Sequence, residues 1–347
     1  MISMGFDAGN SETTVAVRAG SRAQHLTFPS SIGSGDYAEL LRVRSGAGRI
    51  AGLETDEYTI EHRGASLFVG RLALEQSKDA TTARGNTARY ANGHTLRLLL
   101  TACGKLFKDD VTIRLITGLP VKVFSPEEKK AVQASLLGTH TFLFNGRPRR
   151  VTVDAVGVMM EGAATLYDVA AEPVQQCVID VGGGSTDLFW AVGRRPLAER
   201  CVGYGVGVEK IGELLNKKIM GLPNGRRLAD EELRAVLWAH ATKAPLPQLH
   251  SRGRELILNG EIAEAITVVG EELTTFVCQQ WEDADGQVAS SAAHARLIGG
   301  GAYYVKPFLR QAIGHLAVPD APERANAVAY LAIGEAASEE AWARNRG

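Results

Sequence analysis

Residues 177–190 read CVIDVGGGSTDLFW, and this stretch decides how the rest of the chain is interpreted. It has the pattern of an apolar strand, a glycine turn and a second apolar strand. Glycine has no Cβ, so a ligand can approach the backbone closely there, and amides that face a pocket suit phosphate oxygens. Asp180, where the first strand ends, could hold a cation shared with those phosphates. The alternative is an ordinary glycine-rich hairpin turn.

The beginning of the chain repeats this pattern. An apolar run ends in Asp7, Gly9-Asn10-Ser11 form a turn, and residues 13–17 resume a β-branched strand. The two acids lie 180 − 7 = 173 positions apart, half of the 347 residues. A motif that recurs at half the chain length predicts two related halves facing one another. A third glycine turn, Gly299-Gly300-Gly301, follows the short apolar strand 295–298.

Length and composition set broad limits on the protein. The 347 residues are enough for two domains, and the 45% hydrophobic and 22% charged content is ordinary for a globular protein. The net charge of −1 gives no global field for binding nucleic acid or an anionic membrane. The four cysteines are widely spaced, which argues against a zinc site and fits a reducing compartment. We see no signal peptide or membrane span and expect a cytoplasmic location.

Local signals predict several individual elements. The dipeptide Asn145-Gly146 predicts a β-hairpin over residues 141–153. Ser125 before Pro126, with Glu128 closing a capping box, predicts the start of a helix. Helices are also expected over 208–220, over 161–167 and, at the end of the chain, over 323–343. Residues 20–64 are rich in Gly, Ser and Arg, so we expect loops and short strands there. Alternating strands and helices favour mixed α/β sheets covered by helices.

Two familiar nucleotide motifs are missing, and one acid has two interpretations. Gly104-Lys105 lacks the other residues of a P-loop, and Val208 occupies the third glycine position of a dinucleotide-binding fingerprint in 203–208. Glu161 follows the apolar run 156–160 at a strand-to-helix junction. It could stabilise a helix N-terminus through the helix dipole, or orient water for attack on a γ-phosphate. The sequence does not decide between these two roles.

Taken in order, these motifs resemble the actin-type nucleotide fold, and most closely the bacterial and archaeal actin-like proteins, including plasmid-segregation actins. The similarity covers nearly the whole chain and extends to Thr117-Gly118-Leu119-Pro120 and Arg324-Ala325-Asn326-Ala327. The resemblance implies two related α/β domains flanking a nucleotide cleft. Domain I would span 1–170, with a peripheral insertion at about 20–64 and the last helix, 323–343, returning to it. Domain II would span 171–322.

The resemblance also implies a role for each motif. Asp7 and Asp180 would hold Mg²⁺, and Glu161, with Asp180, would serve catalysis. Phosphates would be bound from one side by the first turn and from the other by the second, while the third turn would lie along the adenosine. The nucleotide-binding residues would be Asp7, Gly9, Asn10, Ser11, Thr14, Gly182, Gly183, Gly184, Ser185, Thr186, Gly299, Gly300 and Gly301. Thr14 stands where many actins carry a phosphate-binding lysine.

The function that follows from the resemblance is an ATPase that binds Mg-ATP and self-assembles into dynamic filaments, for plasmid segregation or another cytoskeletal role. Its cofactors would be ATP or ADP and Mg²⁺. Its partners would be further copies of the chain, with DNA reached through an adaptor protein rather than directly, and no membrane. The phosphate motifs also resemble those of phosphotransferases and exopolyphosphatases, and a non-hydrolysing nucleotide-dependent scaffold is a third possibility.

Overall fold

The computed structural model describes residues 1–20, 22–46, 53–82, 93–168 and 173–346. The chain divides into two compact units, which are described separately. Unit 1 comprises Met1–Tyr167 and Arg324–Gly347, and unit 2 comprises Asp168–Glu323. The predicted boundary at residues 170 and 171 lies outside the described residues. The fold is mixed α/β, as predicted.

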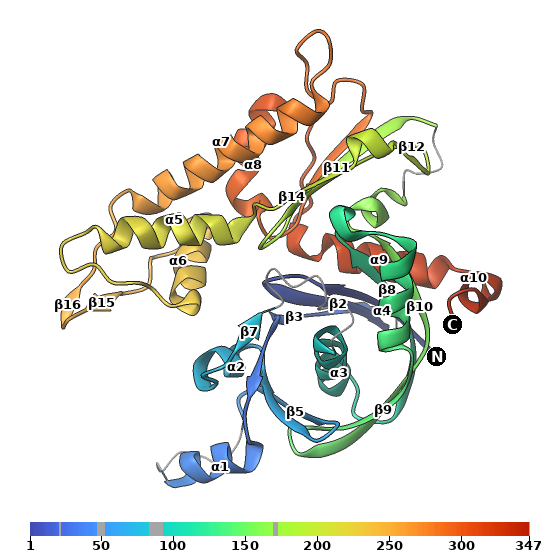
Figure 1. The fold of residues 1–347 in the computed structure, drawn as a ribbon, viewed down its shortest axis with the longest axis vertical. Helices are drawn as coiled ribbons and strands as arrows, with labels where there is room; N and C mark the ends of the chain where they lie inside the picture. Colours follow the sequence, from blue (N-terminus) through green and yellow to red (C-terminus); the bar gives the residue numbers. More distant parts are fainter. Residues whose placement is uncertain (21, 47–52, 83–92, 169–172, 347) are drawn as a thin grey trace. The chain divides into compact units, whose positions relative to one another are not determined.

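Among the described residues of unit 1, ten strands form one sheet in the order β3-β2-β1-β8-β10-β9-β5-β6-β4-β7. The sheet curls around helix α3 (Figure 1). The strands are β1 (Ile2–Ala8), β2 (Glu12–Ala19), β3 (Arg22–Pro29), β4 (Ser31–Ser34), β5 (Tyr58–His62), β6 (Ala65–Val69), β7 (Thr81–Thr82), β8 (Val111–Leu119), β9 (Gly138–Phe144) and β10 (Arg147–Met160). The helices are α1 (Tyr37–Gly46), α2 (Arg71–Gln76), α3 (His94–Leu106), α4 (Pro126–Leu136), α9 (Ala325–Ala336) and α10 (Glu339–Ala343).

Side-chain alternation gives the strands of unit 1 two apolar faces. Met4 and Phe6 of β1 point into the core around α3, which is buried over most of its surface. Gly5, between them, faces α9. A Cβ on Gly5 would lie 1.9 Å from the carbonyl oxygen of Ala327, so only glycine lets α9 pack this closely. Asp7 lies two residues beyond Gly5 and therefore emerges on the α9 face at the end of β1.

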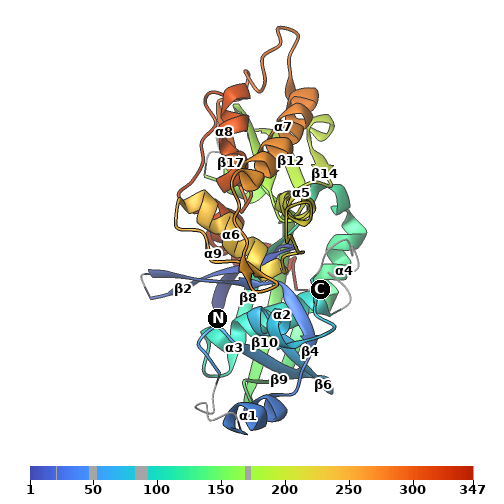
Figure 2. The ribbon, with the colours of Figure 1, turned by 90° about the vertical axis from the view of Figure 1, so that its left-hand side faces the viewer.

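Unit 2 is built on five described strands in one sheet, β13-β12-β11-β17, with β14 paired to β12. Its helices α5, α7 and α8 lie together on one face of this sheet (Figures 1 and 2). Trp190 of β12 and Trp281 of α7 anchor the core between them, with ring centroids 5.1 Å apart. The elements are β11 (Gln175–Val181), β12 (Thr186–Val192), β13 (Arg195–Pro196), β14 (Val202–Tyr204), α5 (Val208–Met220), α6 (Asp230–Thr242), β15 (His250–Ser251), β16 (Arg254–Glu255), α7 (Glu261–Trp281), β17 (His294–Ile298) and α8 (Ala302–Ala312).

Several local predictions are confirmed. The hairpin of β9 and β10 turns at Asn145-Gly146, whose φ angles of 49° and 72° explain the dipeptide. Ser125 caps α4, because its hydroxyl accepts a hydrogen bond from the amide of Glu128 at 3.1 Å. Helix α5 spans residues 208–220 as predicted. In the described part of the chain no helix is long and apolar enough to cross a membrane.

Two regions differ from the prediction. Residues 20–64, predicted as loops and short strands of a peripheral insertion, contain helix α1 and strands β3, β4 and β5, and these strands belong to the main sheet. Residues 21 and 47–52 of this range lie outside the description. The first residues of β3 are exposed at the sheet edge, so the strand has no apolar alternation to reveal it. The last helix is two helices, because Ser338 caps α10 after a break at Ala337.

Candidate functional site

The first predicted phosphate turn joins β1 to β2. Its strands pair from Met4 to Ala8, with Asp7 directly opposite Thr14, so both side chains lie on the same face. A Cβ on Gly9 would lie 2.6 Å from the carbonyl oxygen of Glu12, so the turn requires glycine at this position. Asn10 and Ser11 are half-buried in the turn. The structure therefore places this group of predicted site residues together at one end of the strand pair.

Ser30, which directly follows β3, contacts the turn and the start of β2. The buried hydroxyl of Ser30 lies 2.8 Å from that of Thr13, and the amide of Ser30 donates to the carbonyl of Ser11 at 3.0 Å. Thr14 is only 3% exposed, and its hydroxyl lies 3.4 Å from that of Thr27. Its side chain is thus enclosed beside Asp7, and its predicted contact with a phosphate remains a prediction.

The second hairpin, β11–β12, has the same register as the first. Asp180 pairs with Asp187, and the last strand pair is Val181 with Thr186. In both hairpins the acid lies opposite the residue seven positions later, since 187 − 180 = 7 and 14 − 7 = 7. This shared geometry agrees with the predicted duplication. It also shows that Asp187 occupies the position that Thr14 holds in the first hairpin.

The start of helix α5 holds the second turn in place. The amides of Val208 and Glu209 donate to the carbonyls of Gly182 and Gly183, at 3.1 and 2.9 Å. These helix amides satisfy loop carbonyls, which helps to fix the conformation of the turn. A Cβ on Gly207 would lie 2.5 Å from both of those carbonyl oxygens, so glycine is required for this approach. In the sequence, Gly207 belongs only to an incomplete dinucleotide-binding fingerprint, and no local pattern reveals this role.

Hydroxyl groups of the second turn are used within the unit. Thr186 is fully buried and donates to the carbonyl of Val206 at 2.8 Å. Ser185 donates to the Asp187 carboxylate at 3.3 Å. The Thr186 side chain therefore ties the turn to the segment before α5, and a phosphate contact through this hydroxyl would require that bond to break. Its predicted binding role remains a prediction.

Two carboxylates of unit 2 fit a divalent cation. Asp180 and Asp187 are 7% and 3% exposed and lie directly opposite on neighbouring strands. Carboxylate oxygens are ligands that Mg²⁺ prefers, so these two side chains are candidates to hold it. Across the described chain no group of three or more His, Cys, Asp and Glu side chains is placed to hold a metal. A magnesium ion held here would also have phosphate oxygens and water among its ligands.

The third turn, Gly299 to Gly301, follows β17 and packs on the end of β11. Gly299 has a φ of 83°, and a Cβ there would lie 2.5 Å from the Asp180 carboxylate. The amide of Gly301 donates to the carbonyl of Val181 at 2.8 Å. The structure thus brings the predicted adenosine residues next to the predicted metal ligand Asp180 within unit 2.

In unit 1, Glu161 follows β10 on the α9 face. The predicted helix over 161–167 is wrong: a turn leads into a short 3-10 helix, Ala163–Leu166, so helix-dipole stabilisation does not explain this acid. A Cβ on Gly118 would lie 2.9 Å from Cγ of Glu161 and 2.0 Å from the Tyr330 hydroxyl. Asn326 accepts a hydrogen bond from the amide of Gly162 at 3.1 Å and holds the turn. Local sequence does not reveal that Tyr330 and Asn326 pack around this turn.

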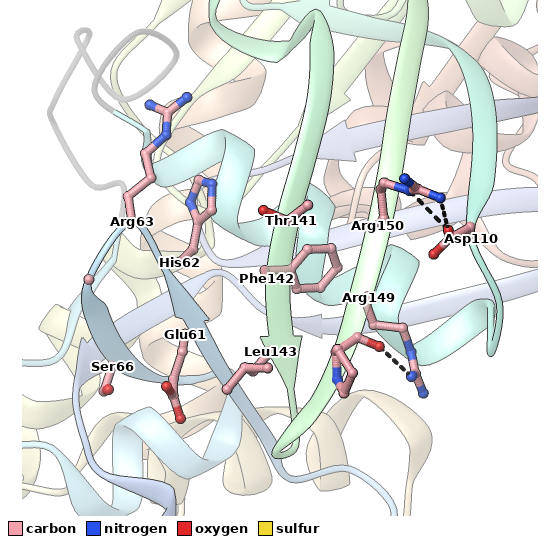
Figure 3. Close-up of a pocket in the computed structure, with 12 residues that line it drawn as sticks. Glu61, His62, Arg63, Ser66, Asp110, Thr141, Phe142, Leu143, Arg149 and Arg150 are labelled. Carbon is pink, nitrogen blue, oxygen red and sulfur yellow. Dashed lines mark hydrogen bonds and ion pairs between the residues drawn. The ribbon is translucent and has the colours of Figure 1, made fainter.

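One hollow of about 680 Å³ lies elsewhere, on unit 1 between the β5–β6 hairpin and strands β9 and β10 (Figure 3). Its side chains include Glu61, Arg63 and Arg149, and Arg150 forms an ion pair with Asp110. None of its lining residues is a predicted nucleotide-binding residue. We therefore place the candidate site at the hairpins and not in this hollow.

Comparisons with known proteins agree with the fold. Residues 5–163 match the family described as the N-terminal domain of actin-like proteins. The archaeal actin homolog Ta0583, solved with ADP, has a TM-score of 0.75 and 18% identity over 97% of this chain and 100% of that chain. A ParM subunit from a 15-stranded Clostridium botulinum filament gives 0.77 and 20%, over 97% and 99%. Bacillus thuringiensis ParM with ATP gives 0.72 and 14%, over 97% and 98%.

The predicted resemblance is therefore confirmed. Residues 5–163 match the model of the actin-like N-terminal domain, and the whole chain has the fold of the bacterial and archaeal actin-like proteins. None of the curated protein sequences compared with the chain matches it.

Proposed function

We propose that this chain binds one Mg-ATP jointly through the β1–β2 and β11–β12 hairpins, hydrolyses it, and assembles into filaments. The observation that carries this proposal is the common register of the two hairpins, each with an acid at the end of its first strand. Asp7 and Asp180 would hold Mg²⁺ on either side of the phosphates. Related structures were solved with ADP, with ATP and as a filament, and these support the same proposal.

Glu161 would orient the attacking water. In the proposed reaction the water oxygen bonds to the γ-phosphorus as the bond to the ADP oxygen breaks, and the water protons pass to the released phosphate and solvent. The side chain of Glu161 lies over Gly118 on the α9 face, the face on which alternation places Asp7. Loss of the γ-phosphate would remove the group that both hairpins hold, and so weaken the filament. Filaments would carry DNA through an adaptor protein, consistent with the absence of net positive charge.

Light scattering and phosphate release, followed together against protein concentration with Mg-ATP, test this function. We expect scattering to appear only above a threshold concentration and phosphate release to rise more steeply there, because a filament grows through repeated non-closing contacts. Glu161→Gln should still assemble but release phosphate far more slowly. Hydrolysis strictly proportional to protein with no scattering would favour the phosphotransferase or phosphohydrolase alternative. Assembly without any hydrolysis would favour the scaffold.

A further inference from the structure

Trp238 is an exposed aromatic side chain in a chain that buries its other tryptophans. Trp190, Trp281 and Trp342 are 0%, 2% and 3% exposed, whereas Trp238 is 51% exposed. It lies on α6, whose core contacts are made by other residues, namely Leu233, Val236, Leu237 and Ala239. Trp238 is therefore not needed to pack its own helix, and its large apolar ring is left with a face in solvent.

The ring is nevertheless held in a defined place. It packs edge-to-face on Tyr303, with centroids 5.2 Å apart and planes at 81°. Tyr303 lies in the first turn of α8, two residues after Gly301, and its hydroxyl donates to Glu323 at 2.8 Å. This contact positions the Trp238 ring before any ligand arrives, which reduces the entropy lost on binding. The pair thus connects Trp238 of α6 to the helix that begins directly after the glycine turn.

Gly300 is the one glycine of that turn that neither its described contacts within unit 2 nor a positive φ requires. Gly299 needs its positive φ, and a Cβ on Gly301 would lie 2.2 Å from the Val181 side chain. A Cβ on Gly300 would meet no atom of the described residues within 4 Å. The space in front of Gly300 is thus open among the described residues, and Tyr303, which holds Trp238, lies three residues further along the chain. An open backbone position and an aromatic ring suit a flat group that touches backbone on one side and stacks on the other.

We propose that Trp238, held by Tyr303, stacks on the base of the bound nucleotide. This inference rests on the proposed function and adds a base-recognition residue that the glycine motifs do not contain. Base stacking on an aromatic side chain changes affinity by roughly 5- to 150-fold when the aromatic is truncated to alanine. Stacking tolerates different bases, so Trp238 would contribute affinity for a base over bare polyphosphate rather than choose between purines.

Tryptophan fluorescence provides the test, because Trp238 is the exposed member of the four. Emission is followed at a protein concentration where light scattering stays at baseline, during titration with Mg-ATP or with magnesium tripolyphosphate, which has no base. Calorimetry measures both dissociation constants. We expect ATP, and not tripolyphosphate, to change the emission. Trp238→Phe should abolish the change and keep ATP affinity within about threefold, since phenylalanine still stacks.

Trp238→Ala should weaken ATP binding by roughly 5- to 150-fold and leave tripolyphosphate binding unchanged. Val268→Ala, which removes another exposed apolar side chain of unit 2, is the matched control and should bind ATP like the wild type. Normal ATP affinity in Trp238→Ala, or ATP binding with unchanged emission, would overturn the inference alone. Emission that varies with protein concentration without nucleotide would assign Trp238 to a contact between copies. No calorimetric ATP binding by the wild type would refute the proposed function itself.

Discussion

Gly207→Ala should destabilise unit 2 far more than Gly205→Ala, although the two glycines lie in the same segment before α5. A Cβ on Gly207 would lie 2.5 Å from the carbonyl oxygens of both Gly182 and Gly183. Backbone atoms cannot rotate away as a flexible side chain can, so the turn and the helix must separate. A Cβ on Gly205 would meet nothing within 4 Å among the described residues.

Two effects contribute to the expected loss. Separation breaks the two hydrogen bonds from the α5 amides, at about 0.5–1.5 kcal/mol each, and the remaining overpacking costs about 1–3 kcal/mol. Gly207→Ala should therefore lower the free energy of unfolding by roughly 2–6 kcal/mol. Gly205→Ala should be neutral or stabilise by up to about 1 kcal/mol, because alanine has less conformational entropy to lose.

Urea unfolding followed by tryptophan emission measures this difference, since Trp190 and Trp281 are buried in the core of unit 2. Calorimetry should also show weaker Mg-ATP binding in Gly207→Ala than in Gly205→Ala, because the displaced turn is the predicted phosphate turn. Equal unfolding midpoints for the two variants would refute the packing argument. Equal ATP affinities, with unequal stabilities, would refute the role of the turn in binding.

Three further predictions concern unit 1. Burial is the main cause that lowers the pKa of His62 to about 4. The unfolded histidine titrates near 6.5, so the free energy of unfolding should fall by at most roughly 3 kcal/mol as the pH drops from about 6.5 to about 4. Melting curves of His62→Gln should lack this pH-dependent step. Arg114→Met should lower the free energy of unfolding in urea by about 1–3 kcal/mol, because Arg114 is buried and its loss leaves Asp154 without this partner. Glu339→Gln changes a side chain that is 77% exposed and should cost less than about 1 kcal/mol. Equal losses in the two variants would contradict this difference. Gly118→Ala should slow phosphate release more than it weakens ATP binding, because its Cβ would displace Glu161; unchanged release would contradict it.

The parts of the fold that local sequence encodes were predictable. The two acid-bearing hairpins could be predicted because an apolar strand, a glycine turn and a second strand follow one another without a gap. The Asn145-Gly146 hairpin and the Ser125 cap depend on backbone preferences of single residues, which the sequence shows directly. By contrast, β3 is a strand because β2 pairs with it, and its exposed residues carry no apolar pattern.

The residues that hold the turns of the candidate site were also not predictable, because they act through contacts that are distant in sequence. Gly207, Ser30 and Asn326 act on turns that lie between 19 and 164 positions away in the chain, so no local pattern marks them. Glu161 was correctly singled out as an acid at a junction, but the expected helix after it is one 3-10 turn, because Gly162 adopts a φ of 81°. The predicted ligand-binding residues stay predictions, and the residues that hold their turns are not marked by local sequence.

Calorimetric titration with ATP tests the central claim, joint binding by the two hairpins, most directly. Wild type should bind one ATP per chain, more weakly when magnesium is chelated. Asp7→Asn and Asp180→Asn should each weaken binding, and the double variant should lose less than the sum of the two, because both carboxylates would act on one ion. An Asp7→Asn variant that binds Mg-ATP like the wild type, while Asp180→Asn does not, would contradict joint binding and leave unit 2 as the sole site.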